Sequence, residues 1–252
     1  MEDTEVTRLL TRFADGMSAV APPAALWAHG SLALGDFRPG RSDLDLVALT
    51  DAPLTPVQEE RLRDLHRRIV AEEPLGGSLH CTYLPLPAVA DTTRPHPTWA
   101  LGEWFERPVT PVARRELELG ARVLSGPPPA GLVPPVSDTE LVEFIRDELR
   151  GYWLPVTAKR ELWGRDIWVD AGMLTFARAS VTLREGRLVT KREALDELRA
   201  QGAPAGVTED IHRRRYGPPR EMPIADDWLV QRGELAREFV RQGIERALGP
   251  AG

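Results

Sequence analysis

The chain reads His29-Gly30-Ser31, then eleven further residues, then Asp43-Leu44-Asp45-Leu46-Val47-Ala48-Leu49. The last stretch is typical of a buried β-strand because it is almost entirely apolar apart from its two acids. Side chains alternate between the two faces of a strand, so Asp43 and Asp45 lie on the same face, about 7 Å apart. A carboxylate in a buried strand is costly unless an opposite charge neutralises it. The pattern therefore predicts two acids that share a bound cation.

The residue types around the acids indicate which cation and which ligand. Mg²⁺ typically binds one or two carboxylates and completes its shell with water and phosphate oxygens. A glycine at position 30 lets backbone amides approach a phosphate closely, and the hydroxyl of Ser31 can donate to a phosphate oxygen. We therefore expect Asp43 and Asp45 to be metal ligands and catalytic residues, with Gly30 and Ser31 binding a nucleotide.

The run from Gly30-Ser31 to Asp43-Leu44-Asp45 resembles the signature of the nucleotidyltransferase superfamily of the polymerase-beta type. Over most of its length the chain also resembles the aminoglycoside adenylyltransferases that modify streptomycin and spectinomycin. The segments that carry this second resemblance are Gly102-Glu103-Trp104, Val123-Leu124-Ser125-Gly126-Pro127 and Leu174-Thr175-Phe176-Ala177-Arg178, followed by Gly186 and Lys191. The resemblance implies an enzyme that transfers AMP from ATP to a hydroxyl of a small molecule and releases pyrophosphate, with Mg²⁺ and ATP required.

The resemblance also implies roles for residues outside the acidic pair. Ser42 is expected near the phosphates, and Arg178 and Lys191 are expected to reach the nucleotide from the second half of the chain. Tyr216 is a weaker match to a tyrosine near the nucleotide. Aromatic rings and carboxylates suit a hydroxylated, cationic acceptor such as an aminoglycoside or aminocyclitol, and the candidates for these contacts are Trp153 and Asp166.

The sequence departs from the family on its third strand. Where the family has a glutamate, the run Leu79-His80-Cys81-Thr82-Tyr83 places His80. A histidine titrates near neutral pH and can accept the proton of the acceptor hydroxyl, but it cannot be a third anionic metal ligand. We expect His80 to lie within reach of the metal site and to replace the carboxylate; Asp91 and Glu103 are the nearest acids that could do so instead.

Proline and glycine divide the chain. Five prolines between Pro127 and Pro135 can neither continue a helix nor pair as a central strand. We expect an α+β protein with a nucleotidyltransferase catalytic domain at residues 1–126, a mixed sheet with flanking helices. A Pro-rich linker at 127–136 and an α-helical bundle domain at 137–252 would follow. Predicted elements are a helix at 4–16, strands at 24–29, 43–49 and 79–84, a helix from Pro56, and helices at 138–152, 167–185, 191–201 and 226–248.

The amino-acid composition excludes several classes of binding partner. The 252 residues include 32 Lys plus Arg and 38 Asp plus Glu, a net charge of −6 that gives no broad positive field for nucleic acid. The single Cys81 excludes an intrachain disulfide and a multi-cysteine zinc site. No apolar run approaches the roughly 20 residues of a membrane span, and the first residues are acidic where a signal peptide is basic. We expect a cytoplasmic monomer or homodimer with neither a nucleic acid nor a membrane partner.

Two alternatives stay open. The loss of the third carboxylate also suits a catalytically impaired nucleotide-binding protein with a regulatory or antitoxin-like role. The second alternative is a nucleotidyltransferase with a different small-molecule acceptor. Acceptor choice depends on a few side chains in the segment that is hardest to align. Four further histidines have no spacing typical of metal ligands and are interpreted as structural: His29, His66, His96 and His212.

Overall fold

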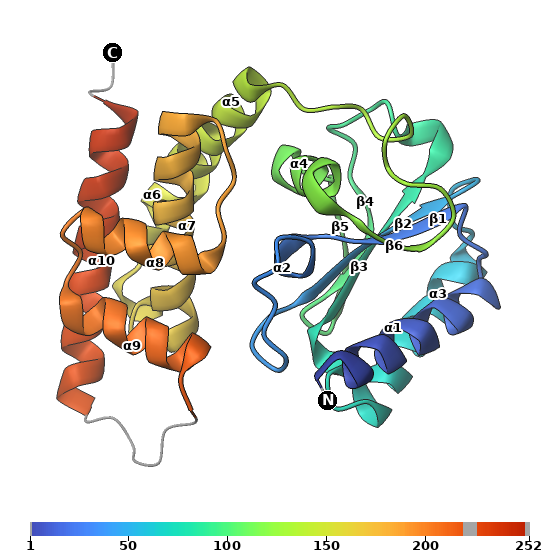
Figure 1. The fold of residues 1–252 in the computed structure, drawn as a ribbon, viewed down its shortest axis with the longest axis horizontal. Helices are drawn as coiled ribbons and strands as arrows, with labels where there is room; N and C mark the ends of the chain where they lie inside the picture. Colours follow the sequence, from blue (N-terminus) through green and yellow to red (C-terminus); the bar gives the residue numbers. More distant parts are fainter. Residues whose placement is uncertain (1, 219–225, 250–252) are drawn as a thin grey trace. The chain divides into compact units, whose positions relative to one another are not determined.

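The structure is a computed structural model that describes residues 2–218 and 226–249. The chain divides into two compact units, Met1–Val136 and Ser137–Gly252, and each has a hydrophobic core of its own. The first unit is a sheet with helices on both faces, and the second is built from helices (Figure 1). The α+β fold predicted from the sequence is confirmed.

One mixed sheet of six strands forms the centre of the N-terminal unit, in the order β5-β4-β3-β2-β1-β6. The strands are β1 Ala25–Ala28, β2 Leu44–Thr50, β3 Leu79–Pro85, β4 His96–Ala100, β5 Glu103–Arg107 and β6 Arg122–Ser125. Strands β2 and β3 run parallel, and the other neighbouring pairs are antiparallel. The three predicted strands correspond to β1, β2 and β3. The sequence prediction missed β4, β5 and β6, because they are short and interrupted by proline or charged residues.

The two faces of the sheet differ. Helices α1 (Glu2–Ser18) and α3 (Pro56–Glu72) pack on the face formed by Leu44, Leu46 and Ala48. The short helix α2 (Gly30–Ala33) and helix α4 (Pro111–Gly120) lie on the other side (Figure 1). Because side chains alternate along β2, Asp45 faces the same side as Val47, which packs with α4. The register of one strand thus places an acid on the α4 face of the sheet.

Two short 3₁₀ turns complete this unit, η1 (Gly76–Ser78) before β3 and η2 (Leu86–Ala88) after it. Helix α3 begins where Pro56 predicted it. The hydroxyl of Thr55 accepts a hydrogen bond from the backbone N–H of Gln58, and the Gln58 side chain accepts one from the backbone N–H of Thr55. This reciprocal pair is a capping box, which satisfies two otherwise unpaired amides.

The proline-rich segment is fixed on the N-terminal unit rather than extended. The indole N–H of Trp27 donates to the carbonyl of Pro127 over 2.8 Å. At the other end of the segment, the Val136 carbonyl accepts from Arg115 Nη2 and the Val136 N–H donates to Glu118 Oε1, both over 2.7 Å. Residues 127–136 therefore pack against α4 and β1, and the division between the two units falls directly after them.

The C-terminal unit consists of helices. They are α5 Asp138–Glu148, a π-turn η3 Leu149–Trp153, α6 Leu154–Thr157, a 3₁₀ turn η4 Arg160–Leu162, α7 Asp166–Glu185, α8 Lys191–Ala200, α9 Ala205–Tyr216 and α10 Asp226–Leu248. The four predicted helices are present. The sequence prediction missed α9, whose apolar stripe is only Val207 and Ile211 and which follows a Gly-Ala-Pro-Ala-Gly run.

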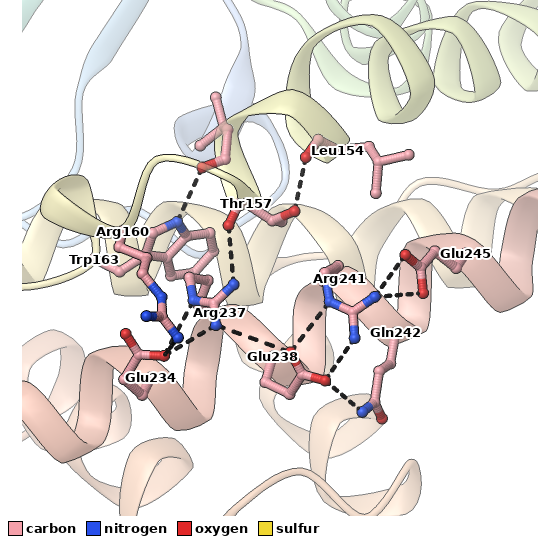
Figure 2. A network of polar contacts seen from close by, with 11 residues as sticks. Leu154, Thr157, Arg160, Trp163, Glu234, Arg237, Glu238, Arg241, Gln242 and Glu245 are labelled. Carbon is pink, nitrogen blue, oxygen red and sulfur yellow. Dashed lines mark hydrogen bonds and ion pairs between the residues drawn. The ribbon is translucent and has the colours of Figure 1, made fainter.

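Helix α10 carries a row of ion pairs, shown in Figure 2. Arg237 binds Glu234 over 2.9 Å, and Arg241 binds Glu245 over 2.7 Å. Arg237 Nη1 also donates to the carbonyl of Thr157, 3.2 Å away, and so connects α10 to α6. Exposed pairs of this kind add little stability, so α10 is held mainly by its buried apolar face. No helix within the described residues is both long and apolar enough to cross a membrane.

Candidate active site

Three side chains predicted from the sequence meet at the start of β2. In the parallel pairing of β2 with β3, Asp45 lies opposite His80. The distance from His80 Nδ1 to Asp45 Oδ1 is 3.4 Å, and that from His80 Nε2 to Asp43 Oδ1 is 3.8 Å. The two carboxylates therefore converge on one imidazole, on the α4 face of the sheet.

Gly30 touches the second acid. Its φ of +64° is a left-handed conformation that favours glycine. A Cβ atom at this position would lie 2.8 Å from Asp45 Oδ2, closer than side chains tolerate. Gly30 is therefore required twice, for its backbone angle and for the close approach of the carboxylate. Ser31 follows it in α2 and is half-buried.

Asp45 is held in its ionised form. Burial alone would raise its pKa, but the hydrogen bond from His80 and the charges of His29 and His80 outweigh that effect and lower the pKa to about 2. Its side chain is 28% exposed and that of Asp43 is 52% exposed. The pair thus presents negative charge to solvent at neutral pH.

His80 has a polar neighbour at each ring nitrogen. The backbone N–H of Leu101 donates to His80 Nε2 over 3.3 Å, so in the neutral ring Nε2 is the acceptor and Nδ1 carries the proton toward Asp45. Leu101 adopts a left-handed φ of +55° in the turn between β4 and β5. This turn and the β2–β3 register together fix the orientation of His80.

A second imidazole, which the sequence analysis interpreted as merely structural, lies beside this group. The distance from His29 Nδ1 to Glu116 Oε2 on α4 is 2.9 Å, and both residues are buried. Burial lowers the pKa of His29, but the hydrogen bond to Glu116 and the charge of Asp45 raise it above its ordinary value overall. The sequence holds no signal for this pair, because its members are 87 residues apart.

Ser42, predicted to lie near phosphates, is buried and shapes the loop that precedes the acids. Its hydroxyl accepts from the backbone N–H of Arg38 over 3.0 Å, and its own N–H donates to the Arg38 carbonyl over 2.8 Å. These contacts close the loop just before Asp43.

The donor set fits the Mg²⁺ that the family resemblance implies. Asp43 and Asp45 supply two oxygen-donor side chains that converge, and Mg²⁺ commonly takes two carboxylates with water and phosphate oxygens. Among residues 2–218 and 226–249, no group of three or more His, Cys, Asp or Glu side chains is arranged to hold a metal. A Mg²⁺ ion at this place would therefore take two carboxylates from the chain and its remaining ligands from the nucleotide and water.

In the C-terminal unit, the three predicted nucleotide-binding residues gather around the start of α8. Arg178 Nε donates to the carbonyl of Val189 over 2.9 Å, and Lys191 is the first residue of α8. Tyr216 ends α9, and the guanidinium of Arg192 lies 4.1 Å from the centre of its ring. The chain positions that the family resemblance singled out are thus neighbours in the folded unit.

The two acceptor-binding candidates have different surroundings. Trp153 lies in the π-turn η3, packs against the helical core and contacts the exposed Tyr152 ring edge-on at 5.4 Å. Asp166, half-exposed at the start of α7, forms an ion pair with Arg232 over 2.5 Å and lies 3.9 Å from Arg214. Its charge therefore already has cationic partners within the unit.

Comparisons with known proteins identify a domain family and a similar fold. Residues 10–82, which contain Gly30, Asp43, Asp45 and His80, match the family model of the nucleotidyltransferase domain. The fold is similar to the crystal structure of spectinomycin adenyltransferase AAD(9) from Enterococcus faecialis with ATP and spectinomycin. That similarity has a TM-score of 0.66 at 16% sequence identity and covers 96% of this chain and 97% of that one. No curated protein sequence gave a significant match. The expected resemblance is confirmed: the chain carries a nucleotidyltransferase domain within an adenylyltransferase-like fold.

Proposed function

We propose that this nucleotidyltransferase-domain protein transfers AMP from ATP to a hydroxyl of a small cationic molecule, an aminoglycoside or aminocyclitol antibiotic, and thereby confers resistance. One observation carries the proposal. Asp43 and Asp45 converge beside Gly30, and within the described residues neither forms an ion pair with arginine or lysine. Two such acids are suited to an external cation. The similarity to an adenyltransferase crystallised with ATP and spectinomycin supports the choice of both substrates.

In this reaction the acceptor oxygen forms a bond to the α-phosphorus of ATP, the bond to the bridging oxygen breaks, and pyrophosphate leaves. Mg²⁺ bound at Asp43 and Asp45 would supply positive charge to the phosphate oxygens. The chain itself keeps Asp45 ionised through His80 and His29. Gly30 allows the backbone to approach the phosphates, and Ser31 supplies a hydroxyl donor beside them, with Ser42 closing the adjoining loop.

The acceptor hydroxyl must lose a proton, and His80 is the proposed base. Its Nε2 lone pair is engaged by the Leu101 N–H at a long 3.3 Å, so displacing that contact would make the nitrogen available to a substrate hydroxyl. The other ring nitrogen, Nδ1, would stay oriented by Asp45. This division of roles resembles a base held by a carboxylate.

The C-terminal unit supplies the remaining proposed contacts. Arg178, Lys191 and Tyr216 would bind the nucleotide, in keeping with their common position around the start of α8. Trp153 would offer an aromatic face to the acceptor. Asp166 is the second acceptor candidate, with a carboxylate that Arg232 shares. ATP and the acceptor are the only partners proposed for a monomer or homodimer, without nucleic acid or membrane.

A second candidate function is nucleotide binding without transfer, in a regulatory or antitoxin-like protein. The observation that favours it is His80, which stands where a carboxylate is expected and has both ring nitrogens occupied. A transferase with a non-aminoglycoside acceptor is a further variant of the first proposal.

Incubation with ATP, Mg²⁺ and a panel that includes streptomycin and spectinomycin tests these readings, with pyrophosphate release and product mass as readouts. The proposal expects release only when a suitable hydroxyl compound is present. ATP binding by calorimetry without consumption on any compound would favour the second candidate. Absence of both binding and turnover would overturn both.

A further inference from the structure

Glu116 and His29 form a buried polar pair next to Gly30 and Ser31, the residues proposed to bind the phosphates. A carboxylate oxygen can only accept a hydrogen bond, so His29 Nδ1 is the donor in the 2.9 Å contact. The side chains are 10% and 8% exposed, for His29 and Glu116 respectively. A buried hydrogen bond of this kind is costly to break, because the partner that remains is left without water.

The backbone of His29 connects the acidic strand β2 to the start of α2. Its N–H donates to the carbonyl of Asp45 over 2.9 Å, and Gly30 follows it directly. His29 is the residue that precedes α2, and its side chain does not cap that helix. The ring instead turns to Glu116. The orientation of His29 is therefore set by Asp45 on one side and by Glu116 on the other.

Helix α4 contacts α2 at a second point. A Cβ atom on Gly120 would lie 3.0 Å from the carbonyl oxygen of Ala33, the last residue of α2. Glu116 lies one helical turn before Gly120, on the same face of α4. Helix α4 thus holds the residue before α2 through a hydrogen bond and the end of α2 through close packing.

We propose that Glu116 is a positioning residue for nucleotide binding: through His29 it fixes Gly30 and Ser31 relative to Asp45. The inference rests on the proposed function, because Gly30 and Ser31 are the residues proposed to bind the phosphates. Without Glu116 the start of α2 keeps its sequence but loses the contact that orients His29, the residue before it. ATP affinity is then expected to fall more than turnover of the bound complex.

The test replaces Glu116 by Leu and by Gln and measures ATP binding by calorimetry together with KM and kcat. Glu116→Leu should raise the Kd and KM for ATP about tenfold, the effect of losing one buried hydrogen bond, with kcat changed less than about threefold. Glu116→Gln, which retains an acceptor oxygen for His29, should lie between Glu116→Leu and the unmodified protein.

Glu73 provides a matched control. Its side chain is also 8% exposed, in the same unit, but it binds Arg8 and Arg12 on α1, across the sheet from the acidic pair. Glu73→Leu should lower the thermal midpoint without changing the Kd for ATP. Equal changes in Kd for the Glu73 and Glu116 variants would show a merely structural role and overturn the inference.

The double variant His29→Leu with Glu116→Leu separates action through His29 from other contacts of Glu116. If Glu116 acts through His29, the Kd for ATP of the double variant should not exceed the larger of the two Kd values of the single variants. A Kd raised by the product of the two single effects would contradict this. Calorimetry also keeps the two proposals distinguishable. If the unmodified protein binds ATP but transfers to no compound, the proposed function fails and the Kd values still judge Glu116. If it does not bind ATP, both proposals fail.

Discussion

Two groups of acids in this molecule have opposite surroundings. Asp43 and Asp45, at the start of β2, converge on His80 and form no ion pair with arginine or lysine within the described residues. In the C-terminal unit, three acids on α7 and α9 are instead paired with arginines, Arg214 and Arg232. These acids are Asp166, Asp170 and Asp210.

The different surroundings separate acids whose charge is available to a ligand from acids whose charge is paired within the fold. Arg232 is fully buried and binds Asp210 over 2.8 Å, so each acid of this network has an arginine partner inside the unit. The pair at β2 keeps its negative charge directed to the surface. Acids without an arginine or lysine partner are the better candidates for metal ligands, and acids with such a partner are the better candidates for structural roles.

The largest expected effect concerns the acids at the start of β2, which have no arginine or lysine partner within the described residues. Asp45→Asn should reduce AMP transfer about a thousandfold or more, since it removes a metal ligand. The thermal midpoint should fall only modestly, because His80 and His29 stabilise the Asp45 carboxylate in the folded chain, as its lowered pKa shows. Asp51→Asn, at the exposed end of the same strand, is the control and should leave both readouts unchanged. A large fall in the midpoint of Asp45→Asn would place this acid with the structural group.

Arg232→Met tests the paired group. Removing the fully buried Arg232 leaves Asp166, Asp170 and Asp210 to share one arginine, Arg214, and should lower the free energy of unfolding by about 3–5 kcal/mol. Urea denaturation of the full chain measures it. Arg241→Met on the same helix, where the ion pairs are exposed, should leave the urea midpoint nearly unchanged. Equal midpoints for the two variants would contradict the structural role.

His66 adds a third case to the comparison of the two acidic groups, because it is a buried titratable group without an opposite charge nearby among the described residues. It stacks on Trp99 with ring centres 4.9 Å apart, its Nε2 lies 2.7 Å from the Tyr83 hydroxyl, and burial lowers its pKa to about 3. Below pH 6.5 the unfolded chain binds a proton that the folded one does not. Stability therefore falls as the pH falls, by about 2 kcal/mol at pH 5.

Urea denaturation at pH 7 and pH 5 measures this loss, followed by tryptophan fluorescence. His66→Gln should lose less stability than the unmodified protein over the same interval. The raised pKa of His29 has the opposite sign, because its contribution is present at low pH and is lost as the pH rises through the folded pKa. The difference between the two proteins isolates His66, and identical pH dependence would refute the assignment.

The smallest expected effect concerns two glycines that share the left-handed backbone conformation. Gly30→Ala and Gly35→Ala both place a side chain at a positive φ, +64° and +73°, which costs about 1–2 kcal/mol of stability. Only the first also brings a Cβ to 2.8 Å from Asp45 Oδ2; nothing lies within 4 Å of the second. Gly30→Ala should therefore raise the KM for ATP about tenfold, while Gly35→Ala leaves KM unchanged. Equal KM values would remove Gly30 from the site.

Much of the site could be predicted because its signals are local. A glycine, two acids in alternation and an apolar strand lie within twenty residues, and strand geometry alone places both acids on one face. His80 required a further step, since only the parallel pairing of β2 with β3 sets it opposite Asp45. The family resemblance supplied that step.

The parts that were missed depend on contacts between distant segments. Glu116 meets His29 across 87 residues, and Arg232 meets Asp166 across 66. No periodicity connects such pairs, so Asp166 looked from the sequence like an available acid. Strands β4 to β6 and helix α9 were missed for a different reason, because their apolar patterns are too short to detect.

The contacts of Val136 determine where the polypeptide can be interrupted. Both of its backbone polar groups are bound by α4, and Leu132 and Val133 pack against the core around Trp27. A break after Gly126 would uncover those apolar side chains and remove the acceptor of the Trp27 indole. A break or an inserted peptide between Val136 and Ser137 spares every one of these bonds. Two fragments divided there are the ones suited to separate expression.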